Sequence, residues 1–215
     1  MSNRLYAASR HQRSMMSISR NSHRFGASGF AFLAVLLTCS MSIAQIPRKK
    51  INPTRADREA WRQVLKIPDD CEKSFQSGYG DTANFGGLEF HRLGPSQYLV
   101  GITCYGGAYQ PGSIYAFYDE YNPSRTRLLK LKGFETKRHG NPLRYSLIDG
   151  FDSFNRKTKQ LEVFSKYRGP GDCGLFVRYR FLRDRPVVVE AREQNCSEIG
   201  FRRHIDYRRW PRKKL

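Results

Sequence analysis

The chain has 215 residues, of which 39% are hydrophobic and 13% aromatic, which allows one globular domain with a modest core and excludes two large ones. Lysine and arginine number 38 against 19 acidic residues, so the formal net charge is +19. What this excess implies depends on where along the chain it lies.

The first 44 residues are typical of a secretory signal peptide. Five arginines and no acid precede the apolar run "GFAFLAVLLTCSM" (29–41), and "SIA" (42–44) follows with the small residues of a cleavage site. The apolar run is shorter than the ~20 residues that a membrane span needs. We therefore predict a signal peptide over 1–44, a basic linker over 45–52, and no transmembrane segment after cleavage. Two alternatives stay open: an uncleaved anchor, because Arg48, Lys49 and Lys50 follow the site so closely, and a lipoprotein acylated at Cys39.

Cleavage changes both the charge and the cysteine count. It removes five of the 38 basic residues and no acid, leaving 33 basic against 19 acidic residues and a net charge of +14. The remaining cysteines are Cys71, Cys104, Cys173 and Cys196. Four cysteines in an exported chain imply two disulfides, and export implies a periplasmic or extracellular location.

The segment 53–68, "PTRADREAWRQVLKIP", is predicted to be a helix. Thr54 can cap it, with Asp57 three residues later completing a capping box. Trp61 and Leu65 lie on a narrow apolar face, and Pro68 ends the segment. A mobile charged segment is the alternative interpretation.

From about residue 75 the pattern changes to short runs rich in β-branched and aromatic residues, separated by Gly, Pro, Asn and Ser clusters. Examples are "QYLVGITCY" (97–105), "SIYAFYDEY" (113–121), "QLEVFSKY" (160–167) and "GLFVRYRFL" (174–182). This spacing is typical of an antiparallel all-β domain. We predict a mainly β fold: one antiparallel β-rich domain over 53–200, meander-like or sandwich-like, with one short N-terminal helix and two disulfides.

The segments 174–182 and 187–193 flank "RDRP" and predict a β-hairpin. One register sets Cys173 opposite Cys196, at a Cβ separation of ~4.5–5.5 Å that suits a disulfide. A register shifted by one residue instead pairs Val177 with Ala191, Tyr179 with Val189 and Phe181 with Val187, apolar against apolar. A bulge at the glycine-rich entry, or a free strand end, would then keep the two sulfurs close.

Two other roles for Cys173 are weaker. A thiol nucleophile needs a base and a lowered pKa, and no histidine stands at a known spacing from it. A structural zinc site needs closely paired ligands such as C-x-x-C, which the chain lacks. We therefore expect Cys173 to bond Cys196, which leaves Cys71 and Cys104 to pair, and we expect no metal and no cofactor.

Several segments carry a family resemblance: "CYGGAYQ" (104–110), "GFD" (150–152), "LEVFSKYRGPGDCG" (161–174) and Cys196. Together they resemble a family of exported bacterial proteins known as domain of unknown function 1176. The overlap runs from about Cys71 to Cys196, and the Gly-Asp-Cys-Gly element is its most specific part. The resemblance implies export and disulfides. It implies no activity and no catalytic residues, and Pro170 is a local departure from it.

The acidic residues of the domain offer weak catalytic candidates. Asp149, Asp152 and Asp172 fit turn-capping aspartates better than a calcium loop, because the D-x-D-x-D-G pattern is absent. A small envelope hydrolase that uses Asp149, Asp152 or His139 in a cleft remains the alternative function.

The C-terminus is predicted to be a basic tail over 201–215. We expect the cations of this tail to contact an anionic surface: Arg202, Arg203, Arg208, Arg209, Arg212, Lys213 and Lys214. The favoured hypothesis is a non-enzymatic envelope protein that binds anionic polymers, lipid head groups or another envelope protein. Nucleic acid is an improbable partner after export, although aromatic and basic residues alternate here. The tail can also be a solvated extension that keeps the protein soluble.

Overall fold

The computed structural model describes residues 46–78, 84–135, 137–138, 141–200 and 206–215. The predicted signal peptide over 1–44 therefore lies outside the described residues. Within the described ranges, no helix has both the length and the apolar character needed to cross a membrane.

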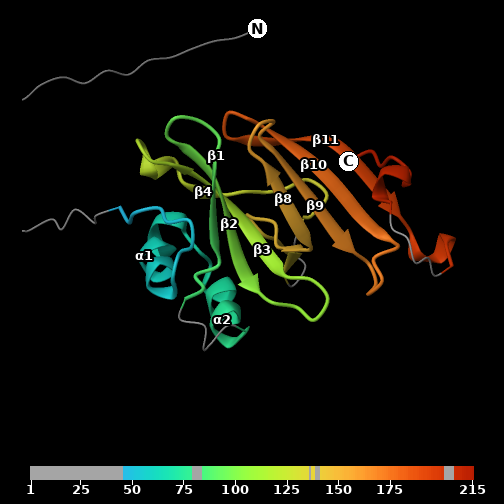
Figure 1. The fold of residues 1–215 in the computed structure, drawn as a ribbon, viewed down its shortest axis with the longest axis horizontal. Helices are drawn as coiled ribbons and strands as arrows, with labels where there is room; N and C mark the ends of the chain where they lie inside the picture. The colour runs from blue at the N-terminus through green and yellow to red at the C-terminus, as the bar shows by residue number, and fades with distance from the viewer. Residues whose placement is uncertain (1–45, 79–83, 136, 139–140, 201–205) are drawn as a thin grey trace, which may run out of the picture. The chain divides into compact units, whose positions relative to one another are not determined.

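Two antiparallel sheets and two helices form the fold, as Figure 1 shows. The first sheet has the order β1 (Leu88–Arg92), β2 (Gln97–Tyr105), β3 (Gly112–Asp119) and β4 (Arg127–Leu128), with β7 (Ile148–Asp149) also paired to β3. The second sheet has the order β11 (Arg185–Gln194), β10 (Gly174–Leu182), β9 (Gln160–Lys166) and β8 (Phe151–Asn155). A short hairpin, β5 (Lys137–Arg138) and β6 (Asn141–Pro142), stands apart. The predicted mainly β, disulfide-stapled class is confirmed.

The predicted helix is present as α1 (Arg55–Leu65), and the capping box is confirmed. The Thr54 side chain accepts from the backbone of Asp57, and the Asp57 carboxylate accepts from the backbone of Thr54 at 2.7 Å. Lys66 ends the helix in the left-handed conformation, before Pro68. A second helix, α2 (Asp69–Gly78), was not predicted.

The main core lies between the two sheets. Strand alternation sends every second side chain inward, so Leu161 and Val163 of β9 meet Leu99 and Phe117 of the first sheet. All four side chains are fully buried. This packing makes the domain a sandwich, one of the two arrangements predicted.

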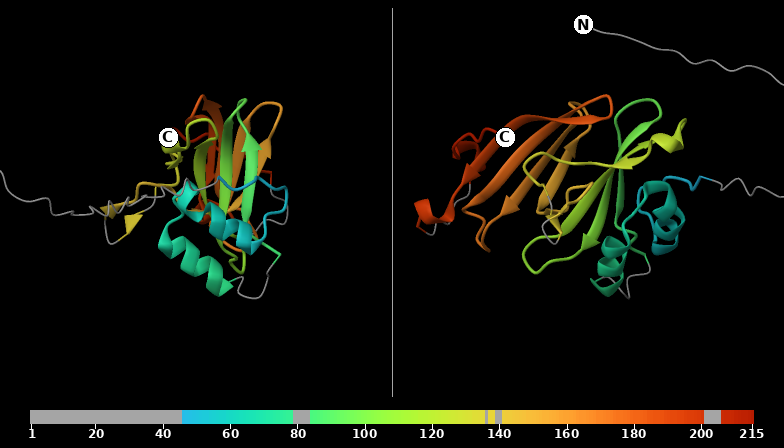
Figure 2. Two further views of the ribbon diagram at one scale, coloured as in Figure 1. Left: turned by 90° about the vertical axis from the view of Figure 1, so that its left-hand side faces the viewer. Right: turned by 180° about the vertical axis from the view of Figure 1, so that it is seen from behind.

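The helices cover the opposite face of the first sheet, as the two further views show (Figure 2). Trp61 and Leu65 of α1 pack there against Val100 and Ile102 of β2. The predicted disulfide Cys71–Cys104 is present and ties α2 to β2. The order of layers is therefore helices, first sheet, second sheet.

The hairpin of β10 and β11 combines one predicted register with an unpredicted bulge. Val177 opposes Ala191, as the shifted register expected, but Tyr179 opposes Val188 and not Val189. The register changes between Arg178 and Tyr179, in mid-strand and not at the glycine-rich entry. The bulge turns Val188 toward the main core and leaves Val189 exposed at the sheet edge.

The last described residues pack on the outer face of the second sheet. Tyr207 stacks on Phe176 at a centroid distance of 4.3 Å, and Trp210 lies 5.6 Å from Phe164. The backbone of Lys213 donates to Ala191 of β11 at 2.9 Å. The segment 206–215 is therefore held against the sheet and does not extend freely from it.

Candidate functional site

Cys173 is a structural residue. It is fully buried and bonded to Cys196, with the two Cα atoms 5.1 Å apart. The two cysteines lie just outside β10 and β11, so the free strand ends accommodate the offset of one residue. The neighbouring Asp172 is held by Arg168 through two bonds of 2.8 and 2.7 Å. A bonded sulfur is neither a nucleophile nor a metal ligand.

The two described hydrolase candidates, Asp149 and Asp152, each accept a hydrogen bond from a different tyrosine. Asp149 accepts a hydrogen bond from Tyr105, and Asp152 accepts one from Tyr115. Burial, followed by the charge and hydrogen bond of Asp152, raises the pKa of Tyr115 well above its ordinary value, so the phenol stays a donor. His139 lies outside the described residues. The two aspartates thus serve as acceptors for two separate tyrosines.

The basic C-terminal cluster is only partly available to a ligand. Its described members are Arg208, Arg209, Arg212, Lys213 and Lys214, while Arg202 and Arg203 lie outside the described residues. Arg209 pairs with Asp206 at 3.2 Å and Lys213 with Glu193 at 2.7 Å. These acids neutralise part of the charge that the sequence assigned to an anionic ligand.

A second basic cluster lies at the edge of the sandwich, where the turn from β1 to β2 approaches the turn from β8 to β9. A pocket of about 680 Å³ opens there, and three cations line it: Arg92, Arg156 and Lys159. All three are exposed. Within the part of the chain that the structure describes, none of them forms an ion pair with an acid. The pocket therefore concentrates positive charge that the protein does not neutralise.

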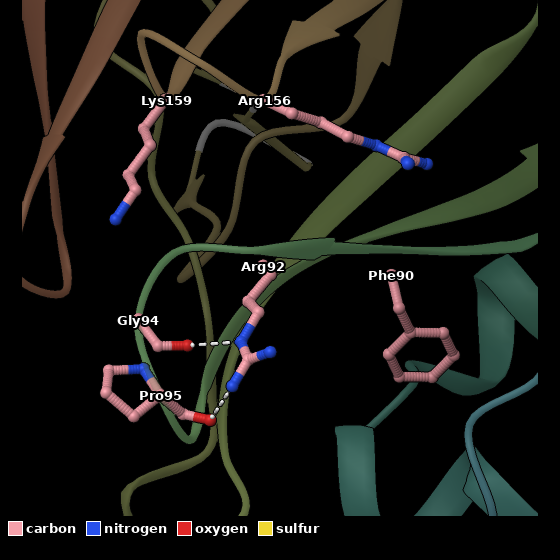
Figure 3. Close-up of a pocket in the computed structure, with 6 residues that line it drawn as sticks. All are labelled: Phe90, Arg92, Gly94, Pro95, Arg156 and Lys159. Carbon is pink, nitrogen blue, oxygen red and sulfur yellow. Dashed lines mark hydrogen bonds between the residues drawn. The ribbon is translucent and has the colours of Figure 1, made fainter.

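Backbone carbonyls fix the orientation of two of these cations, Arg92 and Lys159. Arg92 donates from Nε to the carbonyl of Gly94 at 3.0 Å and from Nη2 to that of Pro95 at 2.9 Å. Lys159 donates to the carbonyl of Leu93, which joins the two turns. Figure 3 shows Arg92 below, at the end of β1, and Lys159 and Arg156 above, on the turn from β8 to β9. A guanidinium held in this way loses less side-chain entropy when it binds an anion.

A larger pocket of about 870 Å³ continues along the same edge. Phe90 and Arg156 line both pockets, so the two form one groove, which we call the edge groove. Its second part is also lined by Lys49, which pairs with Glu120, and by Lys50, which pairs with Asp57. Its strongest unneutralised charge therefore lies at the end formed by the two turns.

Two glycines let the backbone approach closely beside the groove. Gly86 donates to the carbonyl of Pro53 at 2.7 Å, and a Cβ at Gly86 would lie 2.4 Å from the Thr54 oxygen. Gly87 has φ +59°, and a Cβ there would meet the Phe75 ring at 2.7 Å. A larger side chain at Gly86 would push the backbone of Pro53 and Thr54 away, and one at Gly87 would collide with Phe75 of α2.

Two titratable side chains, Glu89 and His91, lie together on the edge strand β1. His91 of β1 stacks on Phe154 of β8 at 4.7 Å, and its Nε2 lies 3.5 Å from a Glu89 oxygen. Burial lowers the pKa of His91, while the charge of Asp152 raises it and that of Arg156 lowers it. The imidazole is therefore neutral at pH 7 and can accept or donate a hydrogen bond.

No other protein identifies this site. The chain matches no protein-family model, no curated protein and no solved structure. Among the described residues, no three His, Cys, Asp or Glu side chains are grouped so as to hold a metal ion.

The edge groove was not predicted from the sequence, although its turns were. "GPS" (94–96) and "FNRKT" (154–158) read as turns, and both lie where expected, between β1 and β2 and between β8 and β9. The cations in or next to these turns, Arg92, Arg156 and Lys159, are single residues with no local pattern. The only signal in the sequence was that these cations fall in or next to turns expected at the same end of the strands.

Proposed function

We propose that the chain is an exported, non-enzymatic envelope protein that binds an anionic polymer or surface through the edge groove. The observation that carries this proposal is the set of three exposed cations around one pocket, Arg92, Arg156 and Lys159, without an acidic partner among the described residues. Two disulfides support an oxidising compartment, periplasmic or extracellular, in which anionic polymers and lipid head groups are the abundant partners. The predicted signal peptide agrees with export.

The C-terminal cations are a competing location for the same function. They carry more formal charge, but Arg209 and Lys213 are each paired with an acid. The edge groove instead has oriented and unpaired cations, which favours it as the principal contact.

A salt titration with two charge-matched variants tests the proposal. The mature chain is mixed with vesicles rich in phosphatidylglycerol at about 10 mM and about 150 mM salt, where the Debye length is about 30 Å and about 8 Å. We expect binding at low salt that weakens at the higher salt. The groove variant Arg92→Gln/Arg156→Gln/Lys159→Gln should bind about 100-fold more weakly, since each cation near an anionic surface contributes about 1 kcal/mol.

The matched control is Arg208→Gln/Arg209→Gln/Arg212→Gln, which removes the same charge from the C-terminal segment. A smaller loss of affinity in this control than in the groove variant supports the edge groove as the binding site. A larger loss of affinity in the control would place the binding site in the C-terminal segment. No binding at low salt, or binding that salt leaves unchanged, would contradict the electrostatic proposal as a whole.

The hydrolase hypothesis has weaker support. Its candidate acids Asp149 and Asp152 are occupied by Tyr105 and Tyr115. Release of soluble products from purified cell-wall material by the wild-type chain, lost in Asp152→Asn, would restore it.

A further inference from the structure

The chemistry of the edge groove changes along its length. Arg92 and Lys159 line only the first pocket and Arg156 lines both, whereas an aromatic ring, a carboxylate and an imidazole line only the second: Phe85, Glu89 and His91. Phe85 is 41% exposed, and the Glu89 side chain is 75% exposed. An anion-binding surface alone has no use for an exposed carboxylate, because its charge repels the ligand.

A sugar ring uses all three groups. Its hydroxyls are donors that a carboxylate accepts, and the neighbouring imidazole can bond a further hydroxyl. Its C–H face packs on an aromatic ring, and the positive edge of those C–H groups suits the negative face of the ring. The Nε2 atom of His91 and a carboxylate oxygen of Glu89 lie 3.5 Å apart, so adjacent hydroxyls of one ring can reach both.

The shared lining residues join these groups to the cations. Phe90 and Arg156 border both parts of the groove, and the two pockets measure about 680 and about 870 Å³. A ligand that fills both parts therefore needs anionic substituents at one end and hydroxyl-bearing rings at the other.

We propose that the ligand of the edge groove is an acidic glycan: a chain of sugar rings that carries carboxylates or phosphates. This inference rests on the proposed function and specifies its ligand class. Arg92, Arg156 and Lys159 bind the anionic substituent, while Glu89 and His91 bond hydroxyls of the chain and Phe85 packs on a ring farther along it. A phospholipid head group would occupy only the cationic end.

The experiment compares polyanions with and without sugar rings. Polygalacturonate carries carboxylates on rings, phosphomannan carries phosphates on rings, and polyacrylate carries carboxylates on a plain carbon chain. The affinity of the mature chain for each is measured at equal charge concentration and equal salt. We expect at least one of the two glycans to bind about 10-fold more tightly than polyacrylate, a difference of about 1.4 kcal/mol. Which of them binds more tightly distinguishes carboxylate from phosphate as the source of the charge.

Two variants separate ring recognition from simple charge. Glu89→Gln removes a repulsive charge, so it should tighten polyacrylate binding while it weakens binding of the preferred glycan. Phe85→Ala should weaken only the glycan. The matched control is Glu59→Gln on α1, which removes an exposed carboxylate (63%) outside the edge groove and should affect all ligands alike. Unchanged melting temperatures exclude a folding effect, and Glu89→Gln carries the test alone if Phe85→Ala is unstable.

The outcomes separate this inference from the proposed function. Equal affinity for all three polyanions would overturn the inference of a glycan ligand. An equal gain in affinity for all three in the Glu89→Gln variant would do the same. Both outcomes leave the proposal of anion binding intact. Failure of every polyanion to bind at low salt overturns the proposed function itself.

Discussion

The ion pair between Arg58 of α1 and Glu72 of α2 is expected to be the most sensitive polar contact of the helical layer. Arg58 Nε donates to Glu72 at 2.7 Å, and the two side chains are only 1% and 5% exposed. Arg58 also donates to the carbonyl of Gly86 at 3.0 Å and lies 3.8 Å from the Phe75 ring centre. Burial lowers the pKa of Arg58, although the hydrogen bond to Glu72 opposes that effect. The pair therefore holds α1, α2 and the backbone beside the edge groove together.

Replacing Glu72 with Gln keeps the shape and one acceptor but removes the negative charge. A buried cation that loses its partner destabilises a protein by about 3–5 kcal/mol. Because the amide still accepts one hydrogen bond, we expect the lower end, about 3 kcal/mol, which is a large fraction of the about 5–15 kcal/mol of a typical domain. For a chain of this size the melting temperature should fall by about 10 °C.

The assay is urea unfolding of the oxidised chain, followed by tryptophan fluorescence and circular dichroism. Asp69→Asn is the matched control, because Asp69 also lies on α2 and pairs with Arg62 at 2.9 Å but is 79% exposed. This exposed pair should contribute less than about 1 kcal/mol. The apolar double variant Arg58→Met/Glu72→Leu should recover most of the loss, since no charge remains buried. If Glu72→Gln costs no more than Asp69→Asn, the reasoning from buried charge is wrong.

Three further predictions concern the second sheet and the sandwich edge. Removing the Cys173–Cys196 bond, which spans 23 residues, with a double serine variant should lower the free energy of unfolding by about 3 kcal/mol, measured from the urea midpoint; an unchanged midpoint would contradict it. Because burial lowers the pKa of His91, folding disfavours its protonated form, so the native state loses stability as the pH falls below the ordinary histidine range. The wild type should therefore lose more stability than His91→Gln between about pH 7.5 and about pH 5, and a smaller loss would show that the imidazolium is stabilised instead. Trp210→Ala should release the C-terminal segment, at a cost of about 3 kcal/mol, and so speed tryptic cleavage at Arg208 roughly 100-fold and lower the melting temperature by about 10 °C; unchanged cleavage would show that Trp210 does not hold the segment.

Local sequence was sufficient where the stabilising contact is itself local. The capping box of Thr54 and Asp57 lies within three residues, so it could be predicted and is present. The strands followed from alternation and turn residues. The pairing of Cys173 with Cys196 followed from a hairpin, in which residues close in sequence face each other.

The features that the sequence did not reveal depend on contacts between distant segments. The helix α2 has little apolar periodicity, and it is stabilised by Cys71–Cys104, by the Arg58–Glu72 pair and by the buried Phe75. A pattern within ten residues cannot show such partners.

The sequence by itself determined the β-rich class, the first helix and the disulfide partners, because alternation, capping and hairpin spacing are short-range properties. Only the tertiary structure decided the bulge beside Tyr179, since the main core takes Val188 in place of Val189. It also decided the edge groove, because Arg92, at the end of β1, and Arg156, on the turn from β8 to β9, belong to different sheets and line one pocket only when the two sheets pack face to face.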